Sequence, residues 1–349
     1  MTNNESKLAR GAVLCPPNAW VDRRRRARSD ASYLDFVIWI IPRTIRALKR
    51  LPSRTFPGVT LMFALLCAGL FCGCARLPAS VKVERDLEYA RAGGQSLKLD
   101  IYLPRKPAGK LPVVVWIHGG SWNSGSKDFC PIGFMAARNL AIVSLNYRLT
   151  DTATFPAPLF DCKGAVRWLR ANAGQYDLDA EHIGIFGASA GGHLALLLAT
   201  TANHPELEGD VGGNLNFSSR VQCVCAFYPP TDLNRLVSDP QSRTNANGDV
   251  ARLIGGAVAQ NLDKAAAASP LTYVDKSCAP VYLLHGGADK LVPPEQSRWF
   301  YEALKQAGVE AHLEIVPGKG HGIIAPPAAA QDIYAFFDRQ LKAGTEQGH

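Results

Sequence analysis

The pentapeptide Gly187-Ala188-Ser189-Ala190-Gly191 is the feature that most restricts the fold of this 349-residue chain. It lies between an apolar run that ends at Phe186 and an alanine- and leucine-rich run over residues 193–200. This order predicts a serine on a sharp turn from a strand into a helix. Glycine is needed on both sides because the strained turn leaves no room for a side chain, and the strain holds the serine hydroxyl out above the sheet edge. Ser189 is therefore a candidate nucleophile.

Two further polar residues follow predicted strands later in the chain. The apolar run over residues 281–284 leads into a loop that contains Asp289, and the run over residues 311–316 leads into a glycine-rich loop that contains His321. The chain order is therefore serine, aspartate, histidine, each after its own strand. This order and placement distinguish an α/β-hydrolase from the other folds that carry the same catalytic triad.

The loop after an earlier predicted strand supplies candidate donors for an oxyanion hole. Residues 112–117 form a wholly apolar, largely β-branched run of the kind that a buried parallel strand needs, and they lead directly into His118-Gly119-Gly120. Two glycines after a strand let the backbone N–H groups turn inward. Together with the N–H of Ala190, those of Gly119 and Gly120 are predicted to stabilise the oxyanion of a tetrahedral intermediate.

The triad residues have distinct expected roles. A serine hydroxyl is a poor nucleophile, so His321 is expected to take its proton while Asp289 fixes the imidazole tautomer and stabilises the imidazolium. Of the histidines near the predicted site, only His321 combines the chain position with the flanking glycines that a mobile catalytic imidazole needs. His118, His193 and His285 are expected to have structural roles.

Alternating strand-like and helical patterns predict the rest of the fold. Strand-like runs cover residues 97–102, 113–117, 141–145, 182–186, 222–227, 280–284 and 311–316, and helical patterns cover residues 159–173, 191–201, 294–307 and 328–341. This alternation predicts an α/β fold of the doubly wound type, with a mostly parallel sheet and helices on both faces. Residues 232–270 do not fit the alternation and are expected to form a small insertion or lid near the site.

Residues 95–341 resemble the α/β-hydrolase family of esterases and lipases that have a His-Gly-Gly oxyanion motif. The similarity is closest to small carboxylesterases, a group that includes acetylxylan and feruloyl esterases and arylformamidase-like enzymes. It implies Ser189 as nucleophile, His321 as base and Asp289 as orienting acid. The matching stretches are His118-Gly119-Gly120-Ser121-Trp122, Asn146-Tyr147-Arg148-Leu149, residues 187–193, Ala288-Asp289 and Gly320-His321-Gly322.

The resemblance also implies that Gly119, Gly120 and Ala190 are the oxyanion donors. The chain departs from the larger hormone-sensitive-lipase branch of the family in two ways. Ser121 stands where that branch has a third glycine, and a long cap at the start of the domain is missing. Both differences favour short acyl groups.

The triad and the resemblance together predict a serine hydrolase that cleaves carboxylic esters. The expected substrate is a small-molecule or polysaccharide ester with an acetyl or feruloyl-type acyl group. An amide or formamide hydrolase, arylformamidase-like or peptidase-like, is the alternative, because the triad alone does not separate the two activities. A non-catalytic binding protein is disfavoured, since such a protein has no reason to keep all three triad residues. No metal and no organic cofactor is implied.

Two aromatic residues are candidates for the substrate pocket. Trp122 follows the two glycines of the predicted oxyanion motif and is expected either to form a wall of the acyl pocket or to pack in the core. Tyr147 follows a predicted strand, and it is expected either to line the cleft or to hold the neighbouring turn through hydrogen bonds.

The cysteines of the predicted catalytic domain are expected to be buried thiols. There are five, which is an odd number, and the two in one strand face the same side, where a disulfide between them is sterically poor. Their spacing lacks the paired cysteines and nearby histidines of a zinc site. Free cysteine is among the most buried residue types. The five are Cys130, Cys162, Cys223, Cys225 and Cys278.

The basic excess of the chain lies entirely in residues 1–58. Of 38 Lys and Arg and 30 Asp and Glu in the chain, 12 and 4 fall in this segment, which leaves 26 of each in the remainder. A neutral catalytic domain offers no phosphate-binding field, so no nucleic-acid partner is expected. Residues 1–58 are interpreted either as a basic N-terminal extension or as the result of a translation start assigned too early.

A hydrophobic stretch follows this extension. Residues 59–71 are too few to span a bilayer, which needs roughly 20 apolar residues, and they have the character of a signal-peptide core. Small Gly73 precedes Cys74, as in a bacterial lipoprotein signal, so residues 59–74 predict export with lipid attachment at Cys74. Ordinary signal-peptidase cleavage near Ala75 or Ala79 is the alternative. The catalytic domain, residues 80–349, is then expected to be either membrane-anchored or periplasmic.

Overall fold

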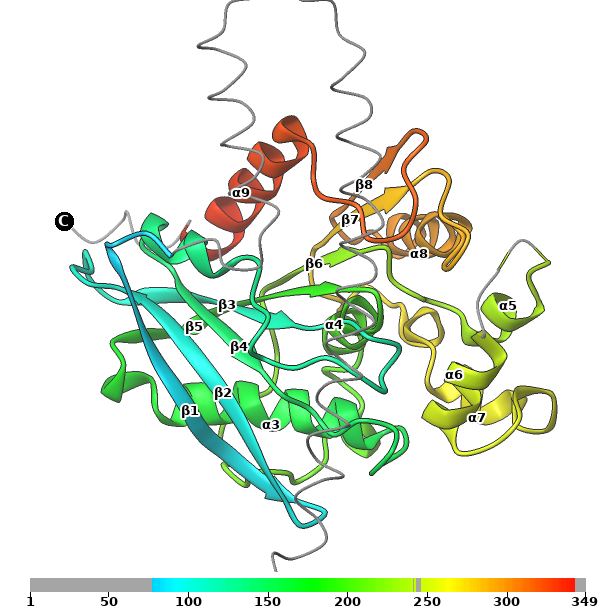
Figure 1. The fold of residues 1–349 in the computed structure, drawn as a ribbon, viewed down its shortest axis with the longest axis horizontal. Coiled ribbons are helices and arrows are strands. Elements are labelled where there is room, and N and C mark those ends of the chain that lie inside the picture. The colour runs from blue at the N-terminus through cyan, green and yellow to red at the C-terminus, as the bar shows by residue number, and fades with distance from the viewer. Residues whose placement is uncertain (1–76, 241, 243–245, 343–349) are drawn as a thin grey trace, which may run out of the picture. The chain divides into compact units, whose positions relative to one another are not determined.

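The computed structural model describes residues 77–342 except 241 and 243–245. In this part of the chain, eight strands form one mixed sheet in the order β1-β2-β4-β3-β5-β6-β7-β8 (Figure 1). β1 and β2 are antiparallel, as are β2 and β4, whereas all other neighbours are parallel. The strands are β1 (Val81–Ala92), β2 (Gln95–Pro104), β3 (Leu111–Ile117), β4 (Ala141–Leu145), β5 (Leu178–Ala188), β6 (Cys223–Phe227), β7 (Val281–Gly286) and β8 (Ala311–Val316).

The central strands are apolar along their whole length. Every residue of β3, β6 and β7 is buried. A parallel strand covered by helices on both sides has no solvent face, so it requires such a continuous apolar run. Because parallel strands end at the same edge of the sheet, the loops after β3, β5, β7 and β8 come together there.

The edge strand β1 is absent from the sequence-based prediction. Its residues alternate irregularly between buried and exposed, and many of them are charged. The pairing with β2 is interrupted by two irregularities, between Glu84 and Leu87 and between Glu88 and Ala90. An edge strand has one side open to solvent, and bulges disturb the two-residue period, so the pattern that identifies a strand is lost.

Helices cover both faces of the sheet (Figure 1). One hydrophobic cluster joins α3, α4 and α8 to the sheet through residues such as Leu169, Leu197 and Phe300, and a second cluster joins α9 to the opposite face through Phe336 and Phe337. The predicted α/β-hydrolase fold is therefore confirmed. The helices are α3 (Ala157–Ala171), α4 (Ala190–Thr200), α5 (Leu233–Ser238), α6 (Ala246–Ile254), α7 (Leu262–Ala267), α8 (Glu295–Gln306) and α9 (Pro327–Lys342).

The insertion after β6 consists of three short helices, α5, α6 and α7, which pack on one another. They lie together beyond the end of β6, in yellow and yellow-green in Figure 1. The sequence pattern predicts the insertion and its limits but not the helices within it.

The five cysteines of the described domain are all unpaired, and four of them are buried as predicted, whereas Cys130 is only partly buried. Burial raises the pKa of the Cys225 thiol well above its ordinary value, so this group stays protonated. Within the described residues no helix is both long enough and apolar enough to cross a membrane. The predicted signal segment and Cys74 lie outside those residues.

Candidate active site

Ser189 occupies a tight turn between β5 and α4. Its backbone is left-handed, with φ 55° and ψ −122°, a region that side-chain-bearing residues rarely adopt. A Cβ atom on Gly191 would lie 2.1 Å from the carbonyl oxygen of Ile117, and one on Gly187 would lie 2.2 Å from that of Gly191. Both glycines are therefore required by lack of space, as the pentapeptide predicts.

The structure brings together the serine, histidine and aspartate that the sequence places on separate loops. His321 Nε2 lies 3.0 Å from Ser189 Oγ, and His321 Nδ1 lies 2.7 Å from Asp289 Oδ2. An ionised carboxylate accepts hydrogen bonds, so Nδ1 carries the hydrogen and donates it to Asp289. Nε2 is then left to accept from the serine hydroxyl, which is the arrangement that a general base needs.

Asp289 is held by four donors. Its Oδ1 atom accepts from the backbone N–H groups of Leu291 and Val292, at 2.8 and 3.1 Å. Its Oδ2 atom faces His321 Nδ1 and also His285 Nε2, which is 3.3 Å away. Burial alone would raise the pKa of Asp289, but hydrogen bonds from His285 and His321 outweigh it and hold the pKa well below its ordinary value. The carboxylate is therefore ionised and fixed in direction.

His285 supports the site from within the core. Its ring is fully buried at the end of β7, with Nε2 2.8 Å from the carbonyl oxygen of Val292 and Nδ1 2.7 Å from Ser297 Oγ. The sequence predicts a structural hydrogen bond for this residue but gives no sign that it reaches Asp289. The sequence signal that could have indicated this contact is the position of His285 near the end of a buried strand, four residues before Asp289.

The oxyanion loop, residues 118–122, lies beside the nucleophile. Gly120 has φ +121°, and its carbonyl oxygen accepts from the backbone N–H groups of Asn123 and Ser124, both at 3.0 Å. The amide N–H groups of Gly119, Gly120 and Ala190 have no hydrogen-bond partner among the described residues. Ala190 lines the cavity at Ser189, whereas Gly119 and Gly120 are not among the residues that line it, so their role as oxyanion donors stays a prediction.

Ser121 and Trp122 continue this loop in an unusual conformation. Both have left-handed backbones, with φ values of 52° and 58°. Two consecutive non-glycine residues in this region store strain, which is a frequent feature of ligand-binding loops. Both residues line the cavity above Ser189. The sequence pattern gives no role to the backbone of Ser121, whose N–H follows those of the predicted donors Gly119 and Gly120 along the chain.

Trp122 is buried and forms one wall of the cavity. Its indole N–H donates to His193 Nδ1 at 3.1 Å, and His193 Nε2 donates to the carbonyl oxygen of Ala268 at 2.7 Å. Burial lowers the pKa of His193 to about 4, so the ring is neutral and can accept from the indole. This chain of hydrogen bonds ties the cavity wall to the end of the insertion.

Tyr147 lies beneath the oxyanion loop. Its hydroxyl donates to the carbonyl oxygen of His118 at 3.0 Å, and its ring stacks on the His118 imidazole with 4.4 Å between ring centres. The side chain is almost completely buried. The sequence predicts that Tyr147 either lines the cleft or holds the neighbouring turn through hydrogen bonds. The structure agrees with the second expectation, because the loop covers the ring and the residue does not line the cavity.

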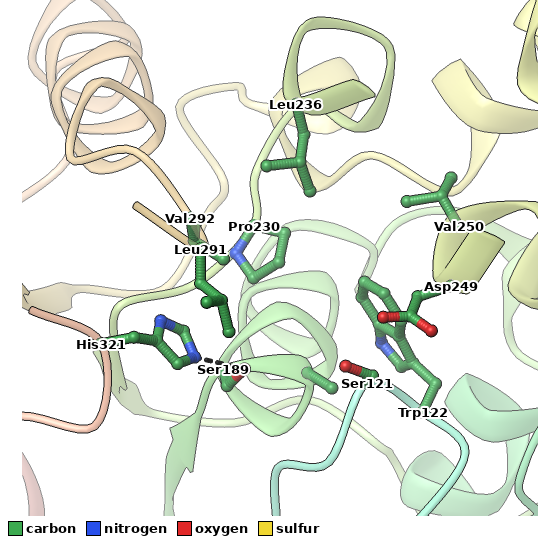
Figure 2. Close-up of a pocket in the computed structure, with 11 residues that line it drawn as sticks. Ser121, Trp122, Ser189, Pro230, Leu236, Asp249, Val250, Leu291, Val292 and His321 are labelled. Carbon is green, nitrogen blue, oxygen red and sulfur yellow. Dashed lines mark hydrogen bonds between the residues drawn. The ribbon is translucent and has the colours of Figure 1, made fainter. Parts of the chain in front are cut away.

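The cavity at Ser189 is small, about 30 Å³ (Figure 2). Its walls are Ser121 and Trp122 from the oxyanion loop, Ser189 and Ala190, Pro230, Leu236, Asp249 and Val250 from the chain after β6, Leu291 and Val292 from the loop after β7, and His321. The insertion therefore contributes to the site, as the sequence predicts. Asp249 is a cavity residue that the sequence pattern does not predict, because a single aspartate in a short amphipathic helix has no distinguishing pattern.

One family model and several known proteins match this chain. The BD-FAE family model matches residues 99–304. The chain is 32% identical over 251 residues to the probable carboxylic ester hydrolase LipM of Mycobacterium tuberculosis, and the match covers 67% of this chain and 56% of LipM. The chain spans little more than half the length of the curated mycobacterial relatives that it matches.

Solved structures share the fold. A bifunctional GH43-CE protein of Bacteroides eggerthii has a TM-score of 0.68 and 37% sequence identity, over 74% of this chain and 35% of that chain. Esterase 2 of Thermogutta terrifontis, phosphonylated by sarin, has a TM-score of 0.63 and 28% identity, over 77% of this chain and 96% of that chain. The family match includes Ser189 and Asp289 and ends before His321. The assignment of His321 to the triad therefore depends on its hydrogen bonds with Ser189 and Asp289.

Proposed function

Because the chain belongs to the BD-FAE family of α/β-hydrolase carboxylesterases, we propose that it hydrolyses carboxylic esters through an acyl-enzyme formed at Ser189. The observation that carries this proposal is the continuous hydrogen-bonded row from Ser189 through His321 to Asp289, with distances of 3.0 and 2.7 Å. The phosphonylation of the Thermogutta terrifontis esterase by sarin supports it, because organophosphonates modify activated serines.

The geometry accounts for each step of such a reaction. Ser189 Oγ attacks the ester carbonyl carbon as His321 Nε2 takes its proton, and the free amides of the oxyanion loop and Ala190 stabilise the negative oxygen. The C–O bond to the alcohol then breaks, and His321 returns the proton to the leaving oxygen. A water molecule, deprotonated by His321, attacks the acyl-enzyme, releases the acid and restores the Ser189 hydroxyl.

We further propose that the acyl group is short, of the acetyl type, or feruloyl-type, on a small molecule or a carbohydrate. The small cavity supports a short acyl group. The BD-FAE family, described as bifunctional acetylxylan and feruloyl esterases, and the bifunctional GH43-CE protein support a carbohydrate ester. Acetyl esters should therefore be turned over faster than palmitoyl esters, and equal or faster turnover of palmitoyl esters would contradict this proposal.

The test is turnover of p-nitrophenyl acetate by the wild type and by Ser189→Ala. We expect Ser189→Ala to lose activity by a factor on the order of 10⁴ or more, because the triad acts as a unit. Ser218→Ala is the matched control, since Ser218 is an exposed serine of the same domain, and it should retain wild-type activity. Substantial activity in Ser189→Ala would overturn the proposal.

The same assay separates esters from amides. N-formylkynurenine and a peptide anilide test the formamidase and peptidase alternatives with the same pair of variants. Faster turnover of either compound than of p-nitrophenyl acetate would replace the esterase proposal with the amide or formamide hydrolase.

We also propose that the catalytic domain is exported and carries lipid on Cys74. The support is in the sequence: a basic segment, the apolar residues 59–71 and the Gly73-Cys74 pair follow one another directly before the domain.

A further inference from the structure

One wall of the cavity carries a carboxylate that the proposed reaction does not use. Asp249 lies in α6, with 19% of its side chain exposed. Its Oδ1 atom accepts from Asn123 Nδ2 and from Arg252, each at 3.3 Å. Its Oδ2 atom has no partner within the part of the chain that the structure describes. Figure 2 shows Asp249 on the same side of the cavity as Trp122 and Ser121, which line it as well.

The proposed reaction determines on which side of the cavity the alcohol part and the acyl part of the ester lie. His321 must return a proton to the leaving oxygen, so the alcohol part of the ester lies on the His321 side of Ser189. The acyl carbon stays bonded to Ser189 with its oxygen toward the amides of the oxyanion loop, and the rest of the acyl part extends along the cavity wall opposite His321. Figure 2 shows Trp122 and Asp249 on that side, across Ser189 from His321.

We propose that Asp249 is a specificity-determining residue that accepts a hydrogen bond from a hydroxyl group on the acyl part of the ester. This inference rests on the proposed esterase function. An acyl chain in the cavity displaces water from the free oxygen of Asp249. A plain alkyl chain leaves that charged oxygen without a donor, which is costly, whereas a hydroxyl replaces the lost water. Of two acyl groups of the same length, the one that carries a hydroxyl is therefore preferred.

Asp249 also links α6 to the oxyanion loop through Asn123. A purely structural role of this kind would change the turnover of all esters together. Selection of a hydroxyl changes the ratio between two esters that differ only in that group. The discriminating readout is therefore a ratio of kcat/KM values, not a single rate.

The experiment compares methyl 3-hydroxybutyrate with methyl butyrate, using the full chain. We expect the wild type to have the higher kcat/KM for the hydroxylated ester. Asp249→Leu keeps a side chain of similar size without an acceptor, and it should lower this ratio by roughly ten-fold or more, since a hydrogen bond to a charged group is lost. Asp249→Asn, which keeps the shape and loses the charge, should give an intermediate ratio.

Asp263→Leu is the matched control, because Asp263 is an exposed aspartate of the same insertion, and it should leave the ratio unchanged. A wild-type ratio of one or less overturns this inference without any variant. An unchanged ratio in Asp249→Leu overturns it as well, although the esterase proposal then survives. Failure of the wild type to hydrolyse any ester contradicts both.

Discussion

Asp289 has four hydrogen-bond donors around its carboxylate, more than any other side chain of the site. Two backbone amides hold one carboxylate oxygen, and His321 and His285 approach the other. A carboxylate fixed in this way orients the His321 ring and stabilises its protonated form without itself taking a proton. The amide of an asparagine has one oxygen and one nitrogen, so it cannot accept on both sides.

Asp289→Asn should therefore lower kcat by roughly 10⁴, because the asparagine favours the wrong imidazole tautomer. Steady-state kinetics with p-nitrophenyl acetate measures the effect. A near-normal rate would point to another acid. Asp232 and Asp263 would then be tested, although Asp232 caps α5 through the backbone N–H of Arg235 and Asp263 is exposed in α7.

The buried His193 makes stability depend on pH. Its folded-state pKa is about 4 because of burial, whereas an unfolded histidine titrates at about 6.5. Between these values the unfolded chain binds the extra proton, so the free energy of unfolding falls as the pH is lowered through this window. Protonation of Nδ1 would also place two N–H donors face to face at Trp122.

His193→Gln should therefore weaken the pH dependence of unfolding between pH 6 and 4.5. The slope of the wild type should exceed that of the variant by up to about 1.4 kcal/mol per pH unit, the value for one proton. Urea unfolding at several pH values measures both slopes. Parallel curves would show that His193 is not the titrating group, and the buried His118, with a pKa of about 4, would be the next candidate.

At the scale of the elements, the turn from β5 into α4 is the most constrained part of the fold. A methyl group on Gly191 would press on the carbonyl oxygens of Ile117 and His118, at 2.1 and 2.5 Å. Neither oxygen can move freely, because β3 lies in the middle of the sheet. The turn and the oxyanion loop are thus packed directly against each other.

Gly191→Ala should cost about 1–3 kcal/mol of stability and most of the activity, because the turn or the oxyanion loop must shift. Urea unfolding and ester turnover measure the two effects. Gly174→Ala is the matched control, since a Cβ there meets nothing within 4 Å and the residue is exposed. Gly191→Ala with the stability and turnover of the control would refute the packing argument.

The helices and strands that the sequence predicts are those whose residue pattern is set mainly by burial against the sheet. The predicted helix at residues 191–201 appears as α4 at residues 190–200, and the apolar run at residues 281–284 lies within the buried strand β7. Continuous apolar runs and helical periodicity reflect burial against the sheet, so they can be read from one chain. The loops of the triad follow from the same strands, because the sheet fixes where each strand ends.

Other elements depend on tertiary contacts and could not be predicted. β1 is held at the edge of the sheet by its pairing with β2, although its own pattern is broken by charges and bulges. α5 and α7 have six residues each, too few for a period to stand out. The contacts of His285 with Asp289 and of Asp249 with Asn123 join residues whose proximity only the folded chain creates.

At the scale of the whole molecule, the export proposal concerns residues outside the described part. Mass spectrometry of the mature N-terminus, with the full chain expressed in a bacterium, tests it. We expect a chain that begins at Cys74 with diacylglycerol on the thiol, because more than one acyl chain is needed for stable anchoring. A chain that begins at Met1 in the cytosol, or a soluble chain that begins at Ala75 or later, would contradict it.

We infer that one serine, Ser189, is activated as the nucleophile of this domain. The most direct test is to treat the protein with an alkyl fluorophosphonate and to locate the adduct by peptide mass spectrometry. We expect one adduct per chain, on the peptide that contains Ser189, and none in Ser189→Ala. An adduct on another residue in both proteins, or no adduct on the wild type while a known serine esterase is labelled completely, would contradict it.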